Sequence, residues 1–373
     1  MVPILSVARA LAVAFVLAPL RTPAAQTPRD TTFPVTGLDF SGVDRFWALG
    51  DILVQDHEPS TAQWDSLLST PAYRLAMRNL GPGLRDDIDL ALRPSRHAEF
   101  VRATAGGSDH SLALQHLAAA YARRAELRRY RDSLVRAAPI AEAIAKAQHL
   151  LPPGATTNGQ PPLVTFAFFR DDGYSLPEGI VVDLLYARVL ALGGVPLTLN
   201  LGHEFHHSYV NRMSRTPPPD GMASGDAALR DALYFVRNEG LADLIDKPVP
   251  FKSPAPGLAG YAVRYNAEYA RTPMVLKQLD SLLATAAGDT ASLGTVGDQA
   301  MGLFWSNGHP NGAYIAREIL QTFGVDSLFP AAHSPAAFLR TFGWAERKHG
   351  RPNPFSDQAL RELATLDDRY WRR

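Results

Sequence analysis

The sequence predicts an α+β protein that is predominantly α-helical, with a small sheet just before a histidine-bearing helix. Segments of helical periodicity, separated by glycine and proline breakers, fill most of the 373 residues. Two segments, residues 163–169 and 180–185, have the short length and the β-branched or aromatic composition of strands. With 46% hydrophobic residues, the chain is long and apolar enough to bury a large core.

Residues 1–25 have the pattern of a secretory signal peptide. A positive charge at Arg9 precedes an apolar run over residues 10–18, and the small residues Ala24 and Ala25 follow. We expect export to the periplasm or the medium, with cleavage near these alanines and no stable membrane span afterwards, since the apolar run is short. An uncleaved N-terminal anchor is the alternative. The chain has no cysteine, which excludes a lipid-modified cysteine and leaves core packing to stabilise an exported protein without disulfides.

Residues 26–155 form a predicted N-terminal helical region. Helices are expected over residues 41–56, 60–69, 71–79, 95–105, 109–137 and 139–150. Five arginines between residues 123 and 131 lie on the longest of these helices, and we interpret them as its solvated face. The chain has 37 basic and 37 acidic residues and no net charge. Neither this balance nor export favours nucleic acid as a partner.

Residues 156–373 form the predicted catalytic region. A linker rich in proline and glycine, residues 151–162, leads into the two strand candidates. One edge of their sheet is expected to hold an extended substrate by backbone hydrogen bonds. Pro196 suits the first turn of the next helix. The remainder is expected to be helical, most clearly over residues 311–323 and 335–342.

The run His203-Glu204-Phe205-His206-His207 carries the chemistry. On a helix, His203 and His207 face the same way one turn apart, so their imidazoles can share one zinc ion. Glu204 would lie beside the metal, where it can take a proton from a bound water. We interpret His206, which is out of step with this pair, as a polar residue at the edge of the helix. Leu197, Leu201, Phe205 and Tyr209 give the helix one buried stripe.

A catalytic zinc needs a third protein ligand and leaves a fourth position for water. The extended metzincin pattern is absent, because Val210 and Met213 stand where it requires glycine and histidine. A downstream carboxylate is the next option, and Glu239 and Asp243 share one face of a following helix. Glu239 can reach the metal, while Asp243 can accept a hydrogen bond from a ligand histidine. Asp243, Asp231 and His309 remain alternative third ligands.

At these residues the chain resembles the gluzincins, the thermolysin-like clan of zinc metallopeptidases, whose signature is H-E-x-x-H followed by N-E-x-x-x-D. The matching residues are His203, Glu204 and His207, then Asn238, Glu239 and Asp243. The resemblance implies a zincin-like catalytic domain with His203, His207 and Glu239 as zinc ligands and Glu204 as general base. It also implies that Asp243 orients a ligand histidine and that Asn238 helps to position the site.

The likeness is local and covers the two motifs alone. The interval between the motifs is longer than in compact members of the clan, and a predicted non-helical loop at residues 214–221 accounts for the excess. The Gly-Ala-Met-Glu-Asn signature of the related aminopeptidases is absent. Together with an arginine-rich, alanine-rich composition, this places the chain among other bacterial families of zinc peptidases.

The sequence therefore predicts an exported, zinc-dependent metallohydrolase, a peptidase that acts on peptide or protein substrates. His309 and Tyr314 are candidates to donate to the oxyanion that forms on the substrate, with Tyr261 and Tyr265 as further ones. Two alternatives stay open. One is a zinc-containing binding or assembly protein without catalysis, and the other is a zinc hydrolase that acts on a non-peptide bond such as an ester or an epoxide.

Overall fold

The computed structural model describes residues 37–81, 83–155, 161–213, 224–252, 256–288 and 293–371. The predicted signal peptide and the predicted loop at residues 214–221 lie outside the described residues, as does the middle of the linker. The predicted class, α+β and predominantly helical, is confirmed by a four-stranded sheet among many helices. In the described part of the chain, no helix combines the length and the apolar character needed to cross a membrane.

Eight helices precede the linker in the described residues. Their bounds are α1 (Ser41–Leu53), α2 (Thr61–Leu68), α3 (Pro71–Leu80), α4 (Leu84–Leu92), α5 (His97–Thr104), α6 (Asp109–Ala122), α7 (Arg124–Ala137) and α8 (Ile140–Gln148). The expected helix over residues 109–137 is wrong as one element. The chain breaks at Arg123, whose φ of −92° and ψ of 13° end α6 and start α7. Helix α4 was missed, although Leu84, Ile88 and Leu92 repeat every four residues and are buried.

The sheet has the strand order β1-β2-β4-β3. Its strands are β1 (Leu38–Asp39), β2 (Leu163–Ala167), β3 (Gly173–Leu176) and β4 (Gly179–Asp183). Strands β1, β2 and β4 are parallel, whereas β3 returns antiparallel to β4 with Gly173 opposite Val182. The sequence predicted β2 and β4, which are almost wholly buried. It missed β1, which has only two residues, and the half-buried β3.

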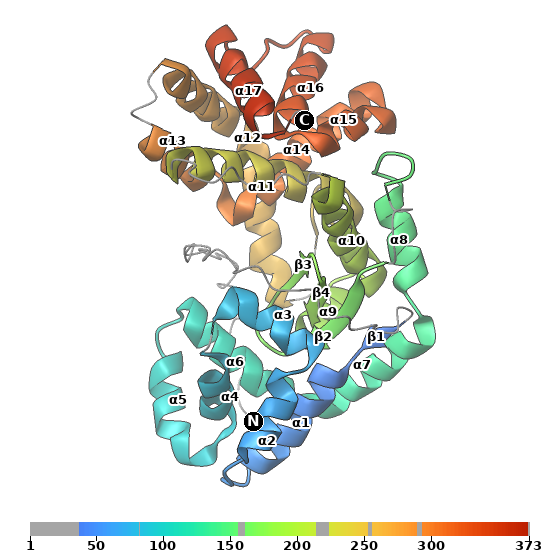
Figure 1. Ribbon diagram of the computed structural model, residues 1–373, viewed down its shortest axis with the longest axis vertical. Coiled ribbons are helices and arrows are strands. Elements are labelled where there is room, and N and C mark those ends of the chain that lie inside the picture. Colours follow the sequence, from blue (N-terminus) through green and yellow to red (C-terminus); the bar gives the residue numbers. More distant parts are fainter. Residues whose placement is uncertain are drawn as a thin grey trace.

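The remaining helices surround the end of the sheet that carries β3 and extend beyond it (Figure 1). They are α9 (Leu184–Leu192), α10 (Leu197–Met213), α11 (Ser224–Asp246), α12 (Pro256–Gly288), α13 (Leu293–Leu303), α14 (His309–Phe323), α15 (Leu328–His333), α16 (Pro335–Lys348) and α17 (Asp357–Tyr370). Helix α10 packs between α8 and α11, and α11 packs in turn against α13 and α14. One continuous hydrophobic core joins the helices before the linker to the sheet and to these later helices.

Candidate metal centre

Helix α10 presents its histidines to the interior. The apolar stripe predicted for this helix lies in the core, and the motif residues beside it are buried as well: His203 and Glu204 are each 4% exposed and His207 is 8% exposed. The interpretation of His206 as an edge residue is wrong. Its side chain is fully buried because α8 and α11 cover α10 on two sides, and burial lowers the pKa of His206 well below its ordinary value.

Side chains from α10 and α11 converge on one point. His203 Nε2 and His207 Nε2 lie 2.9 Å apart. Glu239 Oε2 lies 3.4 Å from the first of these nitrogens and 3.0 Å from the second. In a tetrahedral zinc site with bonds of about 2.0–2.1 Å, neighbouring ligand atoms are separated by about 3.4 Å. Two imidazole nitrogens and a carboxylate oxygen at these separations therefore fit a zinc ion, both in chemistry and in spacing.

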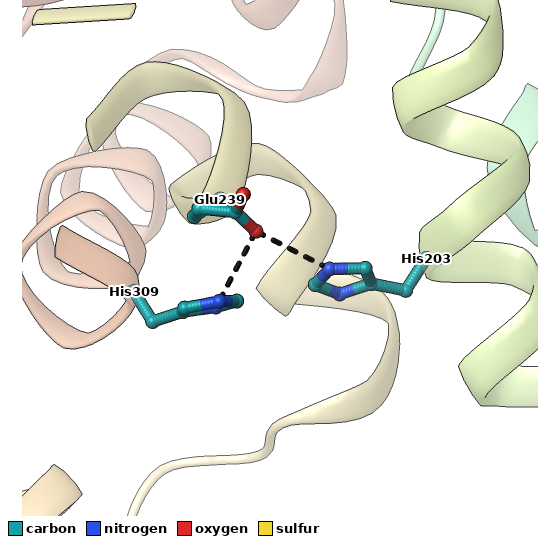
Figure 2. A group of neighbouring side chains, drawn as sticks. All are labelled: His203, Glu239 and His309. Carbon is teal, nitrogen blue, oxygen red and sulfur yellow. Dashed lines mark ion pairs between the residues drawn. The ribbon is translucent and has the colours of Figure 1, made fainter. Parts of the chain in front are cut away.

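His309, at the start of α14, faces the same point from another side (Figure 2). Its Nε2 lies 3.2 Å from Glu239 Oε2, and its ring stacks on that of His203 at 5.7 Å between centroids. His203, Glu239 and His309 thus also form a group whose ligand atoms lie within 4.8 Å of one another. His207 Nε2 lies nearer to Glu239 Oε2, at 3.0 Å, and 2.9 Å from His203 Nε2. Three histidines and Glu239 therefore face the same point.

Two local features of the chain bring His309 to this point. Ser306, Asn307 and Gly308 all have positive φ, at 51°, 53° and 78°, and form a left-handed turn directly before α14. Such conformations are sparsely populated outside glycine and cluster at functional sites. Next, α14 crosses α11 at Gly312 and Gly240, where a Cβ on either glycine would collide with the backbone of the other helix. Close contact of these two helices places His309 next to Glu239.

Polar groups hold the outer nitrogens of His203 and His309, whereas His207 Nδ1 is buried without a hydrogen bond to a described residue. Asp246 Oδ1 lies 3.0 Å from His203 Nδ1, whereas Asp243 Oδ1 lies 3.6 Å from it. Asp243 Oδ1 instead lies 2.8 Å from His309 Nδ1. Lys247 Nζ lies between the two carboxylates, 2.7 Å from Asp243 and 3.1 Å from Asp246. The sequence-based reasoning missed Asp246 and Lys247. Asp246 lies on the face of α11 that carries Glu239, two turns further on, and Lys247 directly follows the end of that helix.

The electrostatic surroundings favour a positive charge at the convergence point. Burial by itself would lower the pKa of His203, but the charge of Asp246 and hydrogen bonds to Asp246 and Glu239 together outweigh burial and raise that pKa to about 10. Burial likewise opposes ionisation of Glu239, yet the nearby His207 and His309 hold its pKa well below the ordinary value. A site that stabilises imidazolium in this way also attracts a metal cation.

Glu204 occupies a different environment from Glu239. Burial raises its pKa above the ordinary value, although the charges of His203 and His207 oppose that shift. Its Oε2 is buried and makes no hydrogen bond to any described residue. A Cβ built on Gly173, the first residue of β3, would lie 3.7 Å from Glu204 Oε1. One oxygen of Glu204, Oε1, thus lies beside the start of the edge strand, and the other, Oε2, is left without a hydrogen bond to a described residue.

Other predicted site residues lie elsewhere. Asn238 donates to the hydroxyl of Tyr234 at 3.2 Å. Asp231 pairs with Arg230 at 2.7 Å, two turns before Glu239. Tyr314 packs its ring against the rings of Tyr269 and Phe342.

The tyrosines named as further oxyanion donors also have other partners. Tyr265 donates to Asp243 Oδ2 at 2.9 Å, and Tyr261 packs against Trp305. Of the oxyanion candidates, His309 is thus the one whose side chain faces the ligand atoms.

Comparisons with known proteins agree with a zinc centre. The model of one protein family, described as "Putative zinc dependent peptidase (DUF5700)", matches residues 64–350. Neither a curated protein nor a solved structure matches the chain. The family match spans well over half of the chain, from helix α2 to the end of α16, and includes every residue of the candidate centre. The chain therefore belongs to the family that carries this description.

Proposed function

We propose that this protein is an exported zinc metallopeptidase of the gluzincin type, with His203, His207 and Glu239 as ligands and Glu204 as general base. The observation that carries the proposal is the convergence of two imidazole nitrogens and one carboxylate oxygen, 2.9–3.4 Å apart, next in sequence to Glu204, a buried carboxylate whose Oε2 makes no hydrogen bond to a described residue. A structural zinc site would not need that second carboxylate.

Zinc, when bound, supplies a Lewis acid that brings the pKa of its water towards about 7 and polarises a carbonyl group. The chain supplies the remaining parts. Glu204, whose pKa burial raises, is suited to take the proton of the attacking water and to pass it to the leaving amine. His309 Nε2 faces the ligand atoms and is placed to donate to the oxygen that gains negative charge. Close packing of α11 against α10, which carries Glu204, and against α14, which carries His309, holds these groups in place before substrate binds.

The edge of the sheet supports a peptide as substrate. Among the described strands, β3 pairs with β4 alone and leaves its other edge for an extended segment. Its first residue, Gly173, lies beside Glu204. A peptide that adds to this edge would bring a backbone carbonyl towards the ligand atoms through main-chain hydrogen bonds. An ester or an epoxide would gain nothing from such an edge, so this placement favours the peptidase over a hydrolase of other bonds.

Export is proposed on the sequence pattern of residues 1–25. A buried apolar core that runs through the described residues supplies the stability that disulfides give to other exported proteins.

The test is to incubate the purified protein with a mixed peptide library and with ester and epoxide substrates, before and after chelation. We expect peptide cleavage that stops with the chelator and returns with zinc, and about one zinc bound per chain. Bound zinc without hydrolysis of any substrate would identify a binding protein. Hydrolysis confined to the ester or the epoxide would identify the other alternative.

A further inference from the structure

Helix α11 carries two carboxylates, and each of them faces a histidine from another helix. We infer that they have separate tasks: Asp246 orients the ligand His203, while Asp243 orients His309, and Lys247 holds both carboxylates in place. This inference rests on the proposed function and departs from the role that the gluzincin resemblance implies for Asp243. Asp246, Asp243 and Lys247 are positioning residues in this scheme, since none of them reaches the convergence point of the ligand atoms.

The distances assign each carboxylate to its histidine. An ionised carboxylate only accepts hydrogen bonds, so the facing imidazole nitrogen must carry the proton. His203 Nδ1 lies 3.0 Å from Asp246 Oδ1, within hydrogen-bond range, and 3.6 Å from Asp243 Oδ1, outside it. His309 Nδ1 lies 2.8 Å from Asp243 Oδ1. For His203, the proton on Nδ1 fixes the tautomer in which the lone pair of Nε2 is left towards the metal position.

Asp243 is also fully occupied by other donors. Its Oδ1 accepts from Lys247 at 2.7 Å as well as from His309, and its Oδ2 accepts from the hydroxyl of Tyr265 at 2.9 Å. Three donors hold this fully buried side chain, so it cannot turn towards His203 without breaking one of these hydrogen bonds. A buried polar group that loses a partner is destabilised, and this keeps Asp243 with His309.

The ammonium group of Lys247 occupies the cluster of His203, Asp243 and Asp246. The acceptor atoms of this cluster lie close enough together to hold a second metal ion. The ammonium group of Lys247 already lies there, within 3.2 Å of three carboxylate oxygens. Because an ammonium is a compact charge with three donors, it takes the place of a cation and links the two carboxylates. The cluster is therefore a support for the first centre.

The spacing on α11 makes this division possible. Glu239, Asp243 and Asp246 follow at intervals of four and three residues and so share one helical face. Pro248 follows Lys247 and ends the helix there. One face of one helix thus carries a ligand, the support of a second ligand and the support of His309.

The test measures zinc affinity and catalysis separately in Asp246→Asn, Asp243→Asn and His309→Gln, in the full chain. Zinc affinity is read by competition with a chromogenic chelator, and turnover is read at saturating zinc. We expect Asp246→Asn to weaken zinc binding by about 10–100-fold. Asp243→Asn and His309→Gln should leave zinc affinity within about threefold and lower kcat by about 10–100-fold. Asp231→Asn is the matched control, because it removes the same charge from α11 at a residue paired with Arg230.

A double variant tests the assignment of Asp243 to His309. If both act on one step, Asp243→Asn combined with His309→Gln should be no slower than His309→Gln alone. A loss of zinc affinity in Asp243→Asn as large as that in Asp246→Asn would overturn the inference. So would unchanged zinc affinity in Asp246→Asn, or additive losses of kcat in the double variant.

Two further experiments apply if a variant does not fold or if no peptide is cleaved. If Asp246→Asn does not fold, adding Lys247→Gln removes the ammonium left without one partner, and zinc affinity is measured in that charge-balanced protein. If no peptide is cleaved, the proposed function fails while the inference is still tested by zinc affinity and by nitrogen NMR of labelled histidine. Asp243→Asn should change the Nδ1 signal of His309 and leave that of His203 in place, and the reverse pattern would refute it.

Discussion

Glu204→Gln is the change that isolates the proposed general base. The substitution keeps the size of the side chain but cannot accept a proton at neutral pH. Since Glu204 Oε2 makes no hydrogen bond to a described residue, no protein contact of that oxygen is lost. Positioned general bases contribute about 10²–10⁴-fold to a rate. At about 1.36 kcal/mol for each factor of ten, the expected loss is about 2.7–5.4 kcal/mol of transition-state stabilisation.

The assay follows zinc content by elemental analysis and peptide hydrolysis at saturating substrate. We expect about one zinc per chain in both proteins, an unchanged or higher Tm for the variant without metal, and the loss in kcat given above. Glu362→Gln is the matched control: it makes the same change at another buried carboxyl whose pKa burial raises, on α17, which carries no ligand. Retention of parental kcat by Glu204→Gln would refute the assignment of the base. Loss of zinc from that variant would instead make Glu204 a ligand.

Four other experiments test separate features of the protein. Glu239→Ala leaves two histidine ligands and should lower both zinc affinity and kcat, with partial rescue by added zinc; zinc binding as tight as in the parent would contradict its role. Gly312→Ala should lower the free energy of unfolding by about 1–3 kcal/mol and reduce kcat, because the added Cβ separates α14 from α11, whereas Gly302→Ala has open space and should do neither. Burial lowers the pKa of His116, but two carboxylates outweigh burial and raise that pKa to about 10. The stabilisation that protonated His116 gives to the folded protein should therefore be complete below about pH 6.5 and be lost as pH rises towards 10, at about 1.4 kcal/mol per pH unit at most. If denaturant titrations gave His116→Gln the same dependence of unfolding free energy on pH as the parent, this role of His116 would be excluded. N-terminal sequencing of protein from its native host should find a start near residue 25 or 26, and an intact Met1 would refute signal cleavage.

The sequence is most informative about elements that have a strong local pattern. Strands β2 and β4 are continuous apolar runs, and α14 and α16 have a clear helical period, so each could be located from composition and spacing. Strand β3 could not be located in this way, because its four residues are half-buried and partly polar. Its extended conformation depends on pairing with β4 and not on a local pattern. The break at Arg123 was also hidden, since arginine favours a helix and only the packing of α6 and α7 turns the chain there.

In the candidate site, the spacing of residues on one helix could be predicted from the sequence, whereas contacts between two helices could not. The spacing of His203 and His207, and that of Glu239 and Asp243, can be predicted because residues four apart on a helix are neighbours. Whether Asp243 or Asp246 meets His203 depends on how α11 is rotated and shifted against α10. That rotation is set by packing over both helices, and a local pattern contains no information about it.

His309 shows what further signal the sequence does contain. Its place beside Glu239 depends on the contact of Gly240 with Gly312, and on a left-handed turn that ends at Gly308. Small residues on two helices permit close approach, and a glycine with positive φ permits the turn. Neither feature of the sequence predicts which two helices will be in contact. Once the contact exists, α11 supports both the ligand set and His309, since Glu239, Asp243 and Asp246 all lie on one of its faces. A displacement of that single helix would therefore disturb metal binding and the stabilisation of the oxyanion together, whereas the paired substitutions at Asp243 and Asp246 should disturb them one at a time.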